Sequence, residues 1–149
     1  MKKWHSVPAI LVVMVILLGM FAMTCTQKPV EGPSSEQLRQ IELLRQLIKS
    51  CEEVGLTGET VVALNEAIDA IEKGDIEGTI SKTQTAATEI ESAAQHGPQL
   101  QAGGADAQKV KQNTADLATL AGCYWGSRGL GGGAFWSNVD KCLKAEGFY

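Results

Sequence analysis

Aromatic side chains are missing from most of this 149-residue chain. Residues 26–121 contain no phenylalanine, tryptophan or tyrosine, whereas the last 26 residues contain six aromatic side chains. A core without aromatic rings must be built from leucine, isoleucine, valine and alanine. The sequence therefore predicts a domain with a core of small side chains, followed by a separate aromatic element at the C-terminus.

Residue types that carry catalysis or bind metals are also scarce. After the first 25 residues His96 is the only histidine, and no two cysteines have the C-x-x-C spacing of a zinc or redox site. We therefore expect no catalytic residues, no metal and no cofactor, and predict a protein that is not an enzyme. The same 124 residues hold eleven basic and seventeen acidic side chains, a net charge of −6, which disfavours nucleic acid as a partner.

Charge is absent from the N-terminal segment between Lys3 and Lys28. The apolar run 7–23 is seventeen residues long, and as a helix it would span roughly 26 Å at about 1.5 Å per residue. Because a bilayer core is about 30 Å thick, the run fits both a signal sequence and a short membrane anchor. Lys2 and Lys3 precede the run, so we expect the N-terminus in the cytoplasm and the remainder outside it.

Cys25 follows the apolar run directly, and polar sequence begins immediately after it. This arrangement resembles a bacterial lipoprotein signal, in which small residues precede a cysteine that is lipidated and becomes the new N-terminus. The resemblance implies cleavage before Cys25 and acylation, including palmitate, at that residue. An uncleaved anchor and ordinary cleaved secretion are the alternatives. All three place residues 26–149 at the non-cytoplasmic face of the membrane, in the periplasm or outside the cell.

Periodic apolar residues predict helices between residues 36 and 122, after a flexible tether at 26–35 that is rich in proline, glycine and serine. Leu38, Ile41, Leu44, Leu47, Ile48 and Cys51 form the stripe of a first helix that begins near Ser34. A second helix is expected after Thr57 and a third after Asp75, with Gly74 ending the second. A fourth, with a weaker stripe, is expected from about Asp106 to Ala121.

Residues 123–149 form the predicted C-terminal element, in which a glycine-rich loop precedes a short helix capped by Ser137. Outside the cytoplasm disulfides persist, and Cys51, Cys123 and Cys142 allow one pair and one free thiol. We expect Cys123 to pair with Cys142, because the bridge would pin the aromatic tail to the end of the bundle. Cys51 with Cys142 is the alternative pairing.

The tail WSNVDKCLKAEGFY is similar to a C-terminal element of many small proteobacterial lipoproteins, in which an aromatic residue precedes a cysteine and Gly plus an aromatic residue closes a short helix. The matching positions are Trp136, Cys142, Leu143, Gly147 and Phe148. The resemblance covers about fourteen residues. It implies a location in the cell envelope and a tail held by a disulfide, and it implies no activity.

Trp125, Arg128 and Trp136 are the candidate binding surface. Exposed tryptophans anchor protein partners and stack on sugar rings, while the alternative is that both rings cover the end of the bundle. The sequence predicts an all-α fold, an up-and-down bundle of three to four helices with a short C-terminal helix, preceded by the signal or anchor segment. We expect a membrane-tethered scaffold or protein-interaction module with a protein partner, or alternatively a module that binds a small ligand or a glycan.

Overall fold

Five α-helices make up the computed structural model of the chain, which describes residues 32–56, 58–96 and 105–149. Within these ranges there is no β-strand, and the chain from Gly32 to Tyr149 forms one compact unit. The helices are α2 (Ser35–Glu53), α3 (Glu59–Glu72), α4 (Ile76–His96), α5 (Ala105–Gly126) and α6 (Gly132–Ala145). The predicted all-α class is confirmed. Thr57 and Cys25 lie outside the described residues.

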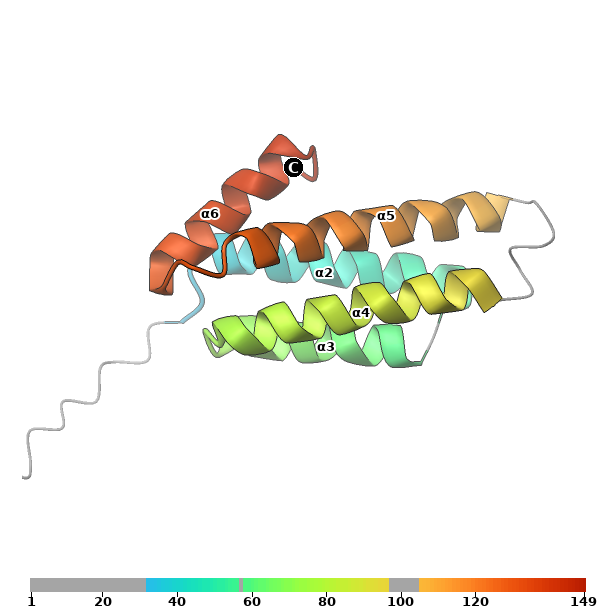
Figure 1. Cartoon of the computed structure of the whole chain (residues 1–149), viewed down its shortest axis with the longest axis horizontal. Helices are drawn as coiled ribbons and strands as arrows, with labels where there is room; N and C mark the ends of the chain where they lie inside the picture. Colours follow the sequence, from blue (N-terminus) through green and yellow to red (C-terminus); the bar gives the residue numbers. More distant parts are fainter. Residues whose placement is uncertain (1–31, 57, 97–104) are drawn as a thin grey trace, which may run out of the picture. The chain divides into compact units, whose positions relative to one another are not determined.

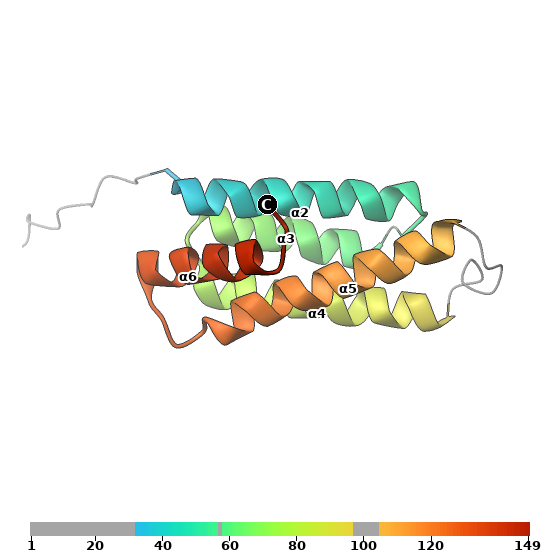
Figure 2. The same cartoon turned by 90° about the horizontal axis from the view of Figure 1, so that it is seen from above.

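Helices α2 to α5 lie side by side and alternate in direction, and α6 lies obliquely over α2 and α5 near one end of the group (Figures 1 and 2). Helix α4 packs most extensively on α3 and α5, while α6 packs on α2 and α5. None of the helices within the described ranges combines the length and the hydropathy that a membrane crossing requires.

The start of α2 is held by a capping box. The Ser34 hydroxyl accepts a hydrogen bond from the Gln37 backbone N–H at 3.3 Å, and the Gln37 side chain accepts one from the Ser34 backbone N–H at 2.9 Å. The Gln37 side-chain nitrogen also donates to the Ile71 carbonyl at the end of α3, 2.6 Å away. The cap therefore fixes where α2 begins and binds it to α3.

A tight turn joins α3 to α4, as the Gly74-Asp75 pair predicts. Gly74 has a φ of 68°, in the left-handed region where a residue without a Cβ is favoured. The Asp75 carboxylate then accepts a hydrogen bond from the Gly78 backbone N–H at 2.9 Å. The carboxylate satisfies one of the free N–H groups at the start of α4, and the two helices form an antiparallel hairpin.

The core consists of aliphatic side chains along most of the bundle and becomes aromatic at one end. Fully buried members from α2 to α5 include Leu44, Leu64, Ile71, Ile90, Leu117 and Leu120. Tyr124 and Phe135 are buried where α6 packs against α2 and α5, and their rings are stacked with centroids 6.1 Å apart. The large aromatic rings thus fill the space that the small-residue helices leave open at this end.

Three local predictions require correction. Leu38 is 54% exposed rather than part of the buried stripe of α2. Helix α5 continues to Gly126, past the predicted end at Ala121, because its last turns bury Cys123 and Tyr124. Helix α6 begins at Gly132 rather than after a Ser137 cap. Burial in the core outweighs the roughly 1 kcal/mol by which glycine disfavours a helix.

Candidate functional site

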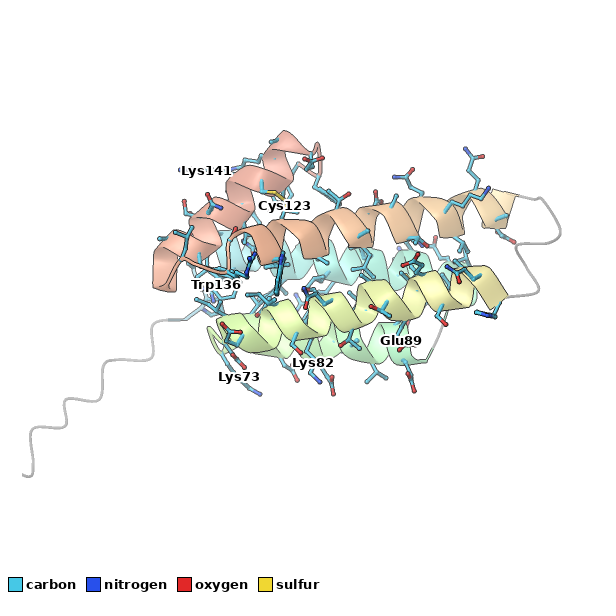
Figure 3. All side chains as sticks on the ribbon, viewed as in Figure 1. Lys73, Lys82, Glu89, Cys123, Trp136 and Lys141 are labelled. Carbon is cyan, nitrogen blue, oxygen red and sulfur yellow. A yellow bond between two sulfur atoms is a disulfide. The ribbon has the colours of Figure 1, made fainter. Side chains whose placement is uncertain are left out.

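A disulfide joins Cys123 near the end of α5 to Cys142 in α6, as predicted. The two Cα atoms are 5.7 Å apart, and the bridge links cysteines that are 19 residues apart in the sequence (Figure 3). Cys51 is the free cysteine of the described residues, and it is buried in α2. Burial raises the pKa of the Cys51 thiol to about 11, so the thiol stays protonated at neutral pH.

A fully buried glutamine connects three helices at this end of the bundle. The Gln40 side-chain nitrogen donates to the Trp136 carbonyl at 3.1 Å, and its oxygen accepts a hydrogen bond from the Tyr124 hydroxyl at 3.0 Å. Gln40 belongs to α2, Tyr124 to α5 and Trp136 to α6. Since an unpaired buried amide or hydroxyl is costly, these bonds require the three helices to meet in one arrangement.

An ion pair adds a second link between α2 and α6. The Arg39 guanidinium donates two hydrogen bonds to the Asp140 carboxylate, at 2.9 and 3.0 Å, and the Lys144 ammonium donates a third at 2.8 Å. The Arg39 hydrogen bonds, supported by Lys144, lower the pKa of Asp140 to about 2 although its burial acts in the opposite direction. Asp140 therefore stays ionised and holds α6 against α2.

Of the three residues predicted to form a binding surface, the structure keeps Trp125 and Arg128 together and buries Trp136. Trp136 is 5% exposed and packs edge-on against Phe135, with ring centroids 4.8 Å apart. Trp125 is 47% exposed in the last turn of α5, and the Arg128 guanidinium carbon lies 4.1 Å from the centroid of its ring. Trp136 thus covers the end of the bundle, while Trp125 and Arg128 form an exposed cation–π pair. A sugar platform built from both tryptophans is not formed.

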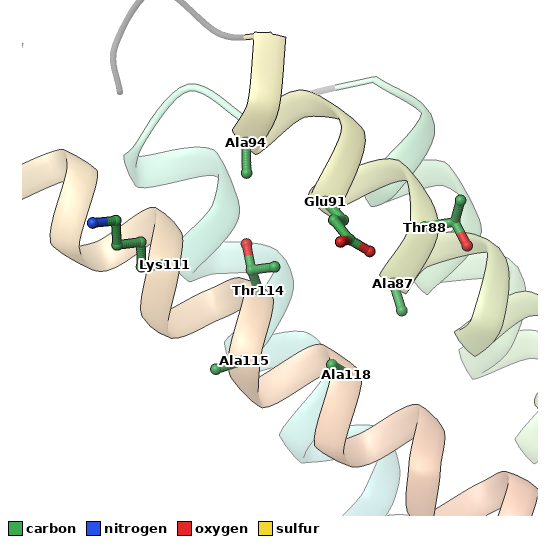
Figure 4. Close-up of a pocket in the computed structure, with 8 residues that line it drawn as sticks. All are labelled: Ala87, Thr88, Glu91, Ala94, Lys111, Thr114, Ala115 and Ala118. Carbon is green, nitrogen blue, oxygen red and sulfur yellow. The ribbon is translucent and has the colours of Figure 1, made fainter. Parts of the chain in front are cut away.

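A groove runs between α4 and α5, on a face that the sequence-based prediction missed. It has a volume of about 400 Å³ and is open to solvent (Figure 4). Most of its lining residues are alanines and threonines, and one residue of each charge joins them. The lining residues are Ala87, Thr88, Glu91, Ala94, Lys111, Thr114, Ala115 and Ala118. Its sequence signal is the run of small residues at steps of three and four in α5.

The α5 wall of this groove continues along the exposed face of the helix. Lys111, Ala115, Ala118 and Gly122 recur at steps of four, three and four, so they lie on one side of the helix. All four are exposed. This spacing is typical of a face that packs against another helix, and no helix of the described residues covers it.

His96 and the surface residue Glu66 both have structural partners. The His96 imidazole is 2.9 Å from the Ser92 carbonyl, one turn earlier in α4. Glu66 forms an ion pair with Lys82 at 2.6 Å on the solvent side of α3 and α4. Within the described ranges no group of three or more His, Cys, Asp or Glu side chains is placed to hold a metal ion.

No protein-family model matches the chain, and neither a curated protein nor a solved structure shows significant similarity to it.

Proposed function

We propose that this protein is exported, is tethered to the membrane through its N-terminal segment, and serves as a non-enzymatic protein-interaction module of the cell envelope. The observation that carries the interaction role is the open groove between α4 and α5. In this proposal the groove binds a helix of a partner protein.

The lining of the groove suits a helix better than it suits a small molecule. Ala115 and Ala118 present only methyl groups, and Gly122 presents none, so another helix backbone can approach α5 closely. Helices pack 8–10 Å apart depending on the side chains at the contact, and small residues allow the shorter distance. Sites for small molecules are usually enclosed, whereas this groove opens along one side of the bundle.

Charges at the groove provide a means of orienting the partner. Glu91 on α4 and Lys111 on α5 are both exposed and lie among the lining residues (Figure 4). Paired opposite charges at the rim of an interface contribute more to orientation and association rate than to affinity. A partner helix with the complementary pair would bind in one direction along the groove.

Export and tethering are supported by separate features. The apolar run followed by Cys25 resembles a lipoprotein signal, and disulfides such as Cys123–Cys142 persist mainly outside the cytoplasm. The C-terminal element that resembles the tail of small lipoproteins supports the same location. The interaction module and the tether are independent parts of the proposal.

Ala118→Arg is expected to abolish partner capture without unfolding the bundle. The arginine would fill the groove with a long charged side chain, and position 118 is exposed, so the melting temperature should change little. The measurement is photo-crosslinking from position 115 in native membranes, followed by identification of the adduct by mass.

Ala145→Arg is the matched control, because Ala145 is also an exposed alanine, in the last turn of α6 and outside the groove. We expect the same protein adduct in the wild type and in Ala145→Arg, and no adduct in Ala118→Arg. An adduct of equal yield in all three proteins, or none in the wild type, would refute the groove as the binding site.

A further inference from the structure

We propose that the bundle contacts the bilayer through the end at which α2 begins, and that Leu38, Trp125 and Leu130 enter the lipid interface. This inference rests on the proposed tether and adds a second, direct contact between the folded unit and the lipid. The contact is made by the side chains of this end and would fix how the α4–α5 groove is presented.

Exposed large apolar side chains gather at this end of the bundle. Five are exposed among the described residues, and three of them are Leu38 at 54%, Trp125 at 47% and Leu130 at 41%. Leu38 lies in the first turns of α2, Trp125 in the last turn of α5, and Leu130 in the loop between α5 and α6. At the opposite end, Val62 in the first turn of α3 is the large apolar side chain that is exposed.

Hydrogen bonds establish that these segments share one end. Gln40, two residues after Leu38, bonds to Tyr124, the neighbour of Trp125, and to the carbonyl of Trp136 in the second turn of α6. The start of α2, the end of α5 and the loop to α6 therefore lie together, as Figures 1 and 2 also show. At the other end Lys109, early in α5, pairs with Glu53, the last residue of α2.

The tether is too short to let this end move far from the membrane. Seven residue steps separate Cys25 from Gly32, where the described unit begins. Even a fully extended chain spans at most about 3.6 Å per residue, so these steps reach roughly 25 Å. A lipid on Cys25 would thus hold the start of α2 within about 25 Å of the bilayer surface, and the exposed apolar residues lie at that same end.

The surroundings of Trp125 match the interface of a bilayer, whereas the α3–α4 turn at the same end exposes Glu72, Lys73, Asp75 and Glu77. Tryptophan is enriched at the level of the lipid headgroups, where its ring is amphipathic. The Arg128 guanidinium stacks over Trp125, and arginine can keep its charge among the phosphates while its stem follows the apolar surface. The loop 129–133 contains four glycines besides Leu130 and no charged side chain that would have to be dehydrated.

The test uses the full chain, extracted from membranes and reconstituted into phosphatidylcholine vesicles with or without brominated acyl chains. Bromine quenches tryptophan emission only on close approach, and Trp136 is buried. In a Trp4→Phe background we expect brominated lipid to cause a loss of Trp125 emission, and we expect no loss in the additional Trp125→Phe variant. Flotation of the same vesicles reports the tether separately.

Val62→Trp in the Trp4→Phe and Trp125→Phe background is the control, because Val62 is 56% exposed at the opposite end. We expect its emission to be insensitive to brominated lipid. Protein that floats with the vesicles but shows no quenching of Trp125, or equal quenching at position 62, overturns the inference and leaves the tether intact. A photo-crosslinker at position 130 that captures a protein and no lipid also overturns it. Failure to float refutes the tether, and the inference falls with it.

Discussion

Ile80→Asp is expected to destabilise the bundle severely. Ile80 is 4% exposed on α4 and belongs to the cluster of buried residues that joins α3, α4 and α5. A carboxylate at this position would be buried without a partner, and burying an unpaired charge or losing a large core side chain is among the few changes that cost more than about 4 kcal/mol. Since small domains are stable by only about 5–15 kcal/mol, this loss is a large share of the total, and chemical denaturation should show a free energy of unfolding lowered by about 4 kcal/mol or more.

Ser81→Asp is the matched control for this variant. Ser81 is the next residue of α4 and is exposed, so the same new charge faces solvent. We expect its free energy of unfolding to change by less than about 0.5 kcal/mol. Equal losses in the two variants would show that the face of α4 assigned to the core is incorrect.

Removal of the disulfide by Cys142→Ser is expected to be the second large effect. A bridge across 19 residues restricts the unfolded chain by an amount that chain entropy puts at about 3 kcal/mol. Without it α6 keeps only its non-covalent links, including Arg39–Asp140 and the Gln40 hydrogen bond. We expect α6 to loosen and Trp136 to become hydrated, which a red shift of tryptophan emission would report, while the helices of residues 34–96 persist.

Sensitivity to reductant separates this effect from a general loss of packing. The wild type and Cys51→Ala should both lose stability when dithiothreitol is added, because both contain the Cys123–Cys142 bridge. Cys142→Ser should show no further loss. Recovery of a non-reduced peptide in which Cys51 is cross-linked would contradict the pairing.

The helices were predictable because their apolar residues recur at helical spacing and their ends carry strong local signals. Ser34 with Gln37, and Gly74 with Asp75, act within four residues of sequence, and both form the contacts that their residue types predict. The disulfide was also predictable, because a glycine-rich segment needs a covalent link to hold the aromatic tail in place.

Where α5 ends and where α6 begins depend on contacts that the local sequence does not encode. Gly122 and Gly126 suggest that α5 ends early, yet Tyr124 is buried by α6 and by Gln40 of α2. Trp125 and Trp136 are the same residue type, and only the packing of α6 decides that one is exposed and the other buried. The groove was missed because its alanines and threonines resemble an ordinary weak stripe until α4 and α5 are placed side by side.

The intact mass of the protein extracted from native membranes tests the central claim, that the module is exported and held at the membrane by its N-terminal segment. We predict a chain that begins at Cys25, carries acyl groups, and lacks two hydrogens relative to the reduced form because of the Cys123–Cys142 bridge. An unmodified chain that begins at Met1 and is recovered from the cytoplasmic fraction would contradict the account.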